Sequence, residues 1–324
     1  MRVLSGIQPS GESLHVGNYF GAMRQQLALA EQHEALLFIA DFHSMTTVRD
    51  GAERRAFARA VALDYLACGL DPQRSMLFRQ SDIPEVCELA WLLCTVTPMG
   101  LLERAHAYKD RIAQGQAMYH GLFAYPVLQA ADILLYHSDL VPVGQDQKQH
   151  VEMCRDIAVR FNNAYGEGLL VLPEPYIPDD VAVVPGTDGR KMSKSYGNAI
   201  AMFAPASQTK KAVMGIVTDS TPVEGPKDTS APLFALWALF AKPDEREALF
   251  ARAQAGGLGY GEVKKDLLQR LNAYFEPMRE RRADLERRPD DVEDILADGV
   301  RRARAIGAPV LAACHAAAGL GSSG

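Results

Sequence analysis

The sequence predicts an α/β protein in which a parallel sheet covered by helices is followed by a smaller all-α domain. Over the first 200 residues, short apolar segments alternate with longer segments of helical periodicity, an order typical of parallel sheets. Between residues 84 and 136 helical segments follow one another with no strand between them, which indicates a helical insertion into the sheet. Beyond this region the last third of the chain is helical in pattern and poor in strands.

The individual elements follow from local patterns. Strands are expected at residues 2–4, 36–40, 76–79 and 141–143, and helices at 17–31, 51–68 and from 84 onward. The helix at 51–68 carries Phe57, Val61 and Tyr65 on one apolar stripe and is followed by Gly69, a residue suited to the C-terminal cap. Residues 219–232 are rich in Pro, Gly, Ser and Thr and are expected to form a loop.

Composition excludes several classes of protein. The 324 residues, 48% of them hydrophobic, can bury one large core and a smaller satellite. The longest apolar run, residues 233–241, is far shorter than the roughly 20 residues that span a bilayer. Residues 1–6 lack the apolar core of a secretory signal, so we expect a cytoplasmic protein with no membrane partner.

The cysteines and the net charge argue against further classes of protein. The cysteines, which lie in helix-like segments without zinc-finger spacing, are expected to be reduced core residues; they are Cys68, Cys87, Cys94, Cys154 and Cys314. The net charge of −6 argues against indiscriminate nucleic-acid binding but is compatible with a local basic face. Basic clusters at residues 210–211, 264–265, 279–288 and 301–304 are interpreted as salt-bridged helix faces, because acidic residues interleave them.

The segment GIQPSGESLHVGN, residues 6–18, leads from the first strand into a helix. Helix N-terminal N–H groups favour anions, and Gly17 permits the close approach of a flat ring. His15 can donate hydrogen bonds to phosphate oxygens, more strongly when it is protonated. The segment matches neither a dinucleotide-binding pattern nor a Walker loop. Taken alone, it is equally compatible with a Gly/Pro turn in which Ser10 caps the helix.

The segment KMSKS, residues 191–195, follows an approach rich in Pro and Gly. Lys191 and Lys194 could clamp a pyrophosphate leaving group, and a loop can close after the nucleotide has bound. A lone pair of lysines is more often solvated. The presence of HVGN at residues 15–18 upstream in an α/β protein favours the functional interpretation.

Together, HVGN and KMSKS resemble the two signatures of class I aminoacyl-tRNA synthetases. The flanking segments resemble the tryptophanyl-tRNA synthetase family; they are SGIQPSG (5–11), NYFGA (18–22), DFHSMT (41–46), AADILLY (130–136) and VPVGQDQKQH (141–150). The resemblance implies a Rossmann-like catalytic domain over residues 1–203, an anticodon-binding helical domain over 204–290, and a C-terminal helix over 291–324 that packs back on the catalytic domain. It also implies ATP, L-tryptophan and tRNA(Trp) as partners and a homodimer, with exposed apolar residues of 84–136 as a candidate interface.

A polar stripe marks a candidate amino-acid pocket. Tyr125, Gln129 and Asp132 are spaced to share one helix face amid apolar residues, and Gln147 lies on another apolar helix stripe. A buried polar group needs a partner, which a bound amino acid could supply. From spacing alone, a solvent-facing stripe is as good an interpretation. The resemblance implies that Asp132 accepts the indole N–H, that Tyr125, Gln129 and Gln147 hold the substrate ammonium and carboxylate, and that Leu4, His43, Val141 and Val143 complete the pocket.

The resemblance also assigns the nucleotide site. The implied ATP-binding residues are Gln8, Pro9, Ser10, His15, Gly17, Asn18, Gly144, Gln145, Asp146, Val183, Lys191, Met192, Ser193, Lys194 and Ser195. Lys191, Lys194, His15 and Gln8 are the expected catalytic residues, and Met192 is expected to pack on the adenine. We expect Mg²⁺ to be carried mainly by the ATP phosphates, with no protein metal site, no zinc and no iron–sulfur cluster, since Cys314 is the only cysteine beyond Cys154.

Three alternatives stay open at this point. Gln129 stands where many tryptophanyl enzymes have Met, and the order Tyr-x-x-x-Gln-x-x-Asp also resembles tyrosyl-tRNA synthetases. Gln145 stands where an acidic residue is common. A small-molecule adenylyltransferase of related fold, or a non-catalytic paralogue that binds RNA or protein, would share part of these signatures.

Overall fold

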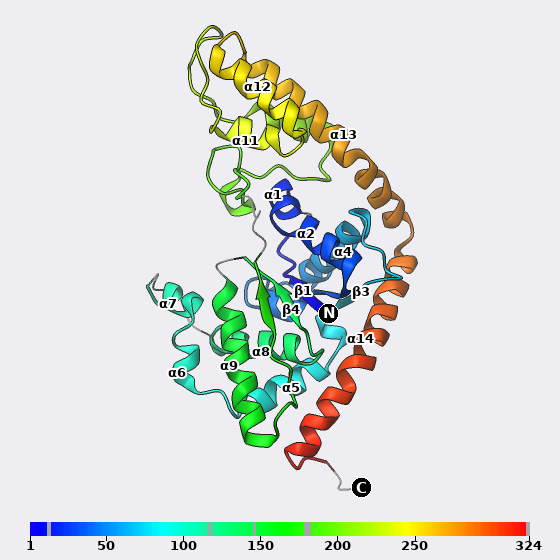
Figure 1. Cartoon of the computed structure of the whole chain (residues 1–324). Helices are drawn as coiled ribbons and strands as arrows, with labels where there is room; N and C mark the ends of the chain where they lie inside the picture. The colour runs from blue at the N-terminus through cyan, green and yellow to red at the C-terminus, as the bar shows by residue number, and fades with distance from the viewer. Residues whose placement is uncertain are drawn as a thin grey trace.

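The protein is described from a computed structural model covering residues 1–11, 14–113, 115, 117, 119–144, 147–177 and 183–321. Its centre is a five-stranded parallel sheet of order β3–β2–β1–β4–β5 (Figure 1). The strands are β1 (Arg2–Ile7), β2 (Glu34–Ile39), β3 (Met76–Arg79), β4 (Leu140–Pro142) and β5 (Glu174–Tyr176). The predicted α/β fold class is confirmed. The strand β5 was missed because it has only three residues and a Pro in its middle, neither of which is typical of a strand.

Alternate residues of the strands face two separate hydrophobic cores, as the pleat requires. In β2, Leu37 and Ile39 face one core, which contains side chains of α2 (Arg24–Gln32) and α4 (Gly51–Ala67). Leu36 and Phe38 face the other, which contains side chains of α5 (Glu85–Cys94), α8 (His120–Leu134) and α9 (Lys148–Tyr165). Strand β2 is therefore a continuous run of apolar residues after Glu34, because both of its faces are buried.

The described residues of the segment between β3 and β4 form helices joined by turns, with no strand. It contains the short turn η2 (Gln80–Asp82), then α5, α6 (Met99–Leu102), α7 (His106–Ala113) and α8. The helix expected at residues 17–31 is interrupted: α1 (Val16–Asn18) passes into a π-helical turn, η1 (Tyr19–Met23), before α2 begins. The short helix α3 (Asp41–Ser44) follows β2. No helix in the described part of the chain is long and apolar enough to cross a membrane.

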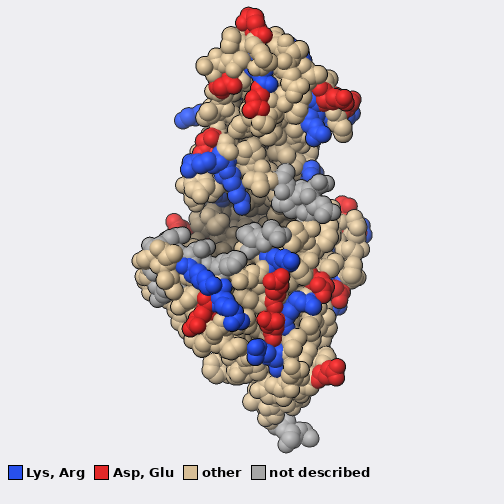
Figure 2. Space-filling view, turned by 60° about the vertical axis from the view of Figure 1, so that its left-hand side comes forward, with Lys and Arg blue, Asp and Glu red and all other residues tan. Residues whose placement is uncertain are grey.

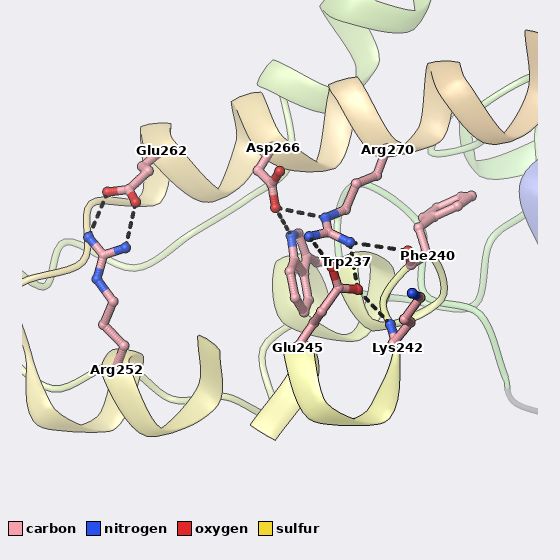
Figure 3. Close-up of polar contacts among 8 residues, drawn as sticks. All are labelled: Trp237, Phe240, Lys242, Glu245, Arg252, Glu262, Asp266 and Arg270. Carbon is pink, nitrogen blue, oxygen red and sulfur yellow. Dashed lines mark hydrogen bonds and ion pairs between the residues drawn. The ribbon is translucent and has the colours of Figure 1, made fainter. Parts of the chain in front are cut away.

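The last third of the chain is helical. It comprises α10 (Ala206–Met214), α11 (Pro232–Ala238), α12 (Pro243–Ala255), α13 (Tyr260–Arg287) and α14 (Pro289–Ala317). The helices α11 and α12 pack with the first half of α13 into a lobe at the top of Figure 1. In this lobe the Arg270 guanidinium of α13 binds Glu245 of α12 and Asp266, and Asp266 accepts the indole N–H of Trp237 at 2.6 Å (Figure 3).

Helices α13 and α14 form a spine along one side of the molecule, with only Arg288 between them (Figure 1). The second of them, α14, runs against the edge strand β3. Gly299 lets the two backbones touch, since a Cβ there would lie 2.0 Å from the Leu77 carbonyl oxygen. An edge strand covered by a helix is protected from pairing with another chain.

We expect Gly299→Ala to lower the free energy of unfolding by about 1–3 kcal/mol, because α14 or β3 must shift to admit the methyl group. Gly261→Ala in α13 is the matched control, since nothing lies within 4 Å of a Cβ built there. It should leave stability unchanged or raise it by up to about 1 kcal/mol. Chemical denaturation of both variants measures the difference, and equal stabilities would contradict the contact.

Candidate functional site

A cavity of about 360 Å³ lies at the carboxyl ends of β1 and β4. In this sheet the chain order reverses between these two strands, and such switch points are where open parallel sheets bind ligands. All eight side chains expected around an amino-acid substrate line this one cavity; they are Leu4, His43, Tyr125, Gln129, Asp132, Val141, Val143 and Gln147. Gln8 and Gly144, expected at the nucleotide, lie on its wall as well.

Asp132 of α8 is the buried acceptor of the cavity, with 2% of its surface exposed. The Gln80 amide donates to both carboxylate oxygens, at 2.7 and 2.9 Å, and Nε2 of His43 lies 2.8 Å from Oδ2. Burial raises the pKa of Asp132, while the hydrogen bonds from His43 and Gln80 oppose that rise. The carboxylate is therefore held in one orientation at the base of the cavity.

Gln80 was missed by the sequence reasoning, although it follows directly on β3. Its Oε1 accepts the backbone N–H of Phe42 at 3.1 Å, so its amide NH₂ is directed at Asp132. A polar residue at the carboxyl end of a buried parallel strand is a signal that could have found it.

A hydrogen-bond chain orders another part of the cavity wall, between α8 and α9. The Tyr125 hydroxyl lies 2.7 Å from Nε2 of His150, and Nδ1 of the same ring lies 2.8 Å from the Gln147 side-chain oxygen. That oxygen can only accept, so His150 carries its proton on Nδ1 and accepts the Tyr125 hydroxyl proton at Nε2. Burial raises the pKa of Tyr125 to about 12. The Tyr125 oxygen thus keeps its lone pairs for a donor in the cavity. His150 was not predicted, because it stands behind the wall.

The aromatic ring of Phe38 forms part of the cavity wall beside β1. A Cβ on Gly6 would lie 2.5 Å from the Phe38 ring, so only glycine lets this ring lie against the β1 backbone. The Gln26 side chain is held in the cavity wall by two hydrogen bonds. It donates to Ser5 at 2.7 Å and accepts from Tyr65 at 2.8 Å. Phe38 and Gln26 line the cavity although neither was predicted.

The nucleotide half of the site begins at His15, the N-cap of α1. Its Nδ1 accepts the N–H of Asn18 at 3.1 Å, and the Asn18 side chain accepts the N–H of His15 at 3.1 Å, a reciprocal capping box. Burial first, and then the charge of Lys194, lower the pKa of His15 to about 4. His15 is therefore a neutral ring with its proton on Nε2 at physiological pH, so of the two expected forms of the donor it is the neutral one.

Two backbone hydrogen bonds bring the KMSKS segment onto this loop. The N–H of Val16 donates to Ile200 at 2.9 Å, and the N–H of Met202 donates to Leu14 at 3.2 Å. Nearby, the Gly17 N–H lies 3.2 Å from the sulfur of the buried Met192. Met192 thus packs against the backbone that was expected to face the adenine.

The lysines of this segment differ in position. A Cβ on Gly11 would lie 2.5 Å from Nζ of Lys194, so this ammonium lies directly over the nucleotide loop. Lys191 is exposed and its backbone forms a bridge with Pro185. Ser193 caps the short turn η4 (Lys194–Tyr196) by accepting the N–H of Ser195. Lys191 therefore lies at the end of a tight hairpin of residues 184–192, and Lys194 begins the turn that follows it.

Asn198 braces this hairpin from inside and was missed by the sequence reasoning. It is 2% exposed, accepts the N–H of Ser193 at 2.8 Å, and donates to Asp188 at 2.6 Å and to the carbonyl of Lys191 at 3.2 Å. Gly186 makes room for it, since a Cβ there would lie 2.3 Å from the Asn198 amide. One buried amide thus holds the first three residues of KMSKS.

The remaining expected nucleotide contacts are less closely grouped. Gln8 donates to Thr47 at 3.2 Å, Pro9 is buried, and Ser10 and Val183 are exposed. Gln145 and Asp146 lie outside the described residues. Among the described residues, no three His, Cys, Asp or Glu side chains gather as a metal site.

One face of the molecule is hollowed between the helical lobe and the sheet, with Lys and Arg side chains above and below the hollow (Figure 2). The basic clusters of the helical half are largely engaged within the chain. Lys264 donates to the carbonyls of Met214 and Ile216, and Arg304 binds Glu85. Their interpretation as structural pairs agrees with these contacts.

Comparison with known proteins decides the family. The sequence model described as "tRNA synthetases class I (W and Y)" matches residues 1–276. The chain belongs to this family. It is 52% identical to the tryptophan–tRNA ligase of Fusobacterium nucleatum over 94% of each chain. It is 54% identical to that of Rhodopirellula baltica, over 96% of this chain and 97% of the relative.

Solved structures agree with this synthetase assignment. The tryptophanyl-tRNA synthetase of Campylobacter jejuni, in complex with ADP and tryptophan, superposes with a TM-score of 0.92 at 47% identity and covers 99% of this chain and 100% of its own. A tyrosyl-tRNA synthetase of Archaeoglobus fulgidus, at 21% identity and a TM-score of 0.64, shares the fold alone. The predicted family and the prediction of an aminoacyl-tRNA ligase are confirmed, and the tyrosyl alternative is less well supported.

The neutral state of His15 in this synthetase can be measured directly. We expect its ring to titrate near pH 4 in the folded protein, because burial and Lys194 disfavour the imidazolium. Nitrogen NMR of histidine-labelled protein, with His15→Asn to assign the signal, reports both the pKa and the tautomer. Titration near 6.5, or a proton on Nδ1, would contradict the capping geometry.

Proposed function

We propose that the chain activates L-tryptophan with ATP to form tryptophanyl-adenylate and transfers the tryptophanyl group to tRNA(Trp). The observation that carries the proposal is the buried carboxylate of Asp132, oriented by Gln80, in a cavity whose wall also holds Phe38, Leu4 and Gln8. The relatives named tryptophan–tRNA ligase support the choice of amino acid.

On the amino-acid side, an indole N–H can only donate and an ionised carboxylate can only accept, so Asp132 and tryptophan are complementary. The Asp132 oxygens are already oriented by Gln80 and His43, which leaves little freedom to adapt to a differently placed donor. The indole would lie against Phe38, Leu4, Val141 and Val143. Tyr125, Gln129 and Gln147 would then hold the ammonium and carboxylate at the mouth of the cavity.

On the nucleotide side, the tryptophan carboxylate attacks the α-phosphate of ATP and pyrophosphate leaves. The substrate supplies the nucleophile, so the protein contributes positioning and stabilisation of charge on phosphoryl oxygens. His15 would donate from Nε2, Gln8 would contact the α-phosphate region, and Lys191 and Lys194 would hold the departing pyrophosphate.

The other assigned residues would shape the nucleotide site. Pro9, Ser10, Gly17 and Asn18 would line the phosphate path. Gly144, Gln145, Asp146, Val183 and Met192 would surround the adenosine, with Ser193 and Ser195 shaping the loop. Mg²⁺ enters with the substrate, bound by phosphate oxygens and its own waters.

We further propose that residues 1–203 form the catalytic domain, 204–290 the anticodon-binding domain, and 291–324 a helix that returns to the catalytic domain. The contact of α14 with β3 supports the last assignment. The two sides of the hollow in Figure 2 carry Lys and Arg, a suitable surface for an RNA backbone.

Two variants test the two halves of the proposal separately. Asp132→Asn should raise KM for tryptophan by roughly 10-fold or more, because the buried acceptor is weakened. Lys194→Ala should lower kcat by about 10²-fold, the scale of removing one transition-state donor. Amino-acid-dependent ATP–pyrophosphate exchange measures both parameters. Equal losses for tryptophan, tyrosine and phenylalanine in Asp132→Asn would discredit Asp132 as the indole reader.

We also propose that the chain pairs with a second copy through α5. Trp91 is 70% exposed and Met99 is 62% exposed, and Cys87 and Cys94 lie on the same exposed face of α5 as Trp91. Both cysteines were expected in the core, so their exposure is a correction. An exposed apolar patch of this kind marks an interaction site.

Trp91→Glu should convert the dimer to a monomer, because a charge would be buried in the interface. Val223→Glu, an apolar-to-acidic change at a side chain 50% exposed outside α5, is the control and should stay dimeric. Sedimentation velocity distinguishes the two states. A monomeric unaltered protein, or a dimeric Trp91→Glu, would contradict this interface.

A further inference from the structure

Three arginines of α13 turn toward the catalytic domain. The Nε of Arg279 donates to the carbonyl of Met202 at 2.8 Å, and the Nε of Arg281 donates to that of Ala67 at 2.7 Å. The Nε of Arg282 donates to Asp64 at 2.7 Å. Only 14% of the Arg282 side chain and 16% of the Arg279 side chain are exposed, so the contacts of these two arginines differ from the solvated pairs at the end of the helix, whereas Arg281 is exposed.

Asp64 of α4 joins α13 to the nucleotide loop. It is fully buried, and its two oxygens have different partners: Oδ1 accepts from Arg282, and Oδ2 accepts the backbone N–H of Leu14 at 2.9 Å. Leu14 immediately precedes His15, so the position of this carboxylate determines where the loop enters α1. Burial raises the pKa of Asp64 to about 6, against the effect of Arg282, so the group is ionised at neutral pH.

Arg279 and Arg282 also contact the chain segment that follows KMSKS. Leu14 accepts the N–H of Met202, whose own carbonyl accepts from Arg279. The Arg282 guanidinium lies 5.0 Å from the ring centroid of Phe203, the next residue. Helix α13 therefore contacts residues 202–203 directly and Leu14 through Asp64, on the two sides of the bridge between His15 and Ala201.

We infer that Asp64 and Arg282 are positioning residues for adenylate formation, through which the placement of α13 sets the position of Leu14 and His15. This inference rests on the proposed function. Neither residue touches the amino-acid cavity, so the link acts on the nucleotide half alone. A displacement of the helical lobe, of which α13 is part, would reach the phosphate-binding loop by this route.

Exchange kinetics per active site test the inference. Asp64→Asn keeps an oxygen for Leu14 but sets an NH₂ against Arg282, and Arg282→Gln removes the charge. Each should lower kcat for tryptophan-dependent pyrophosphate exchange about 10-fold or more, with KM for tryptophan changed less than twofold. The double variant should be no slower than the slower single one, because both act through one link. Arg282→Lys, which retains the charge, should recover part of the rate.

Arg287→Gln on the same helix is the matched control, because its partner Asp284 is exposed and its side chain is 73% exposed. It should leave kcat unchanged. Kinetics are normalised to active sites by the burst of adenylate, so loss of folded protein does not imitate the effect. An unchanged kcat per active site in Asp64→Asn, or strictly additive effects, would overturn the inference.

The imidazole NMR signal of His15 gives a readout that needs no activity. It should move in Asp64→Asn and in Arg282→Gln but not in Arg287→Gln. If the unaltered chain shows no tryptophan-dependent pyrophosphate exchange, the proposed function fails. The His15 signal still tests, independently of activity, whether Asp64 and Arg282 set the position of His15. A His15 signal that stays in place in both variants would contradict the link.

Discussion

Two backbone hydrogen bonds, from Val16 to Ile200 and from Met202 to Leu14, hold together segments that are almost 190 residues apart in the chain. The nucleotide half of the site depends on them, because they set His15 opposite the hairpin and the turn that carry the lysines. Other contacts secure the same junction: Met192 against Gly17, Lys194 over Gly11, and Asn198 within the hairpin. Preorganisation of this kind suits a reaction in which the enzyme supplies geometry and charge and no nucleophile.

The amino-acid half is organised around one buried carboxylate. Asp132 is held by Gln80 and His43, and the carbonyl of His43 accepts a long hydrogen bond from Gln8 at 3.4 Å. Gln8 stands between the two halves, on the wall of the cavity and in the loop that leads to His15. In the proposed function, specificity and chemistry would have separate residues but share the loop after β1, which lies at the switch point of the sheet.

Local patterns predicted the strands β1 to β4 and the helices that cover them, since apolar runs and helical periodicity are properties of short segments. Of the eight side chains around the cavity, Tyr125, Gln129, Asp132 and Gln147 were indicated by their helical spacing; the family resemblance supplied the other four and all the roles, which stay predictions. His150 escaped although it lies three residues from Gln147, and Gln80 and Asn198 escaped because only folding brings their side chains to Asp132 and to the turn of residues 188–193. The arginines 279, 281 and 282 resembled a solvated helix face for the same reason. The exposure of Cys87 and Cys94 was missed because, apart from Glu85 and Glu88, the residues of their helix are apolar on every side.

Pyrophosphate exchange of the unaltered protein, with tryptophan and tyrosine side by side, tests the central claim most directly. The account predicts ATP–pyrophosphate exchange that depends on tryptophan, with a kcat/KM for tyrosine lower by several orders of magnitude. The related tyrosyl enzyme is a worked example of the principle: a site built around one substrate hydrogen bond can discriminate by about 10⁵ without editing. Exchange supported equally by both amino acids, or by neither, would contradict the account.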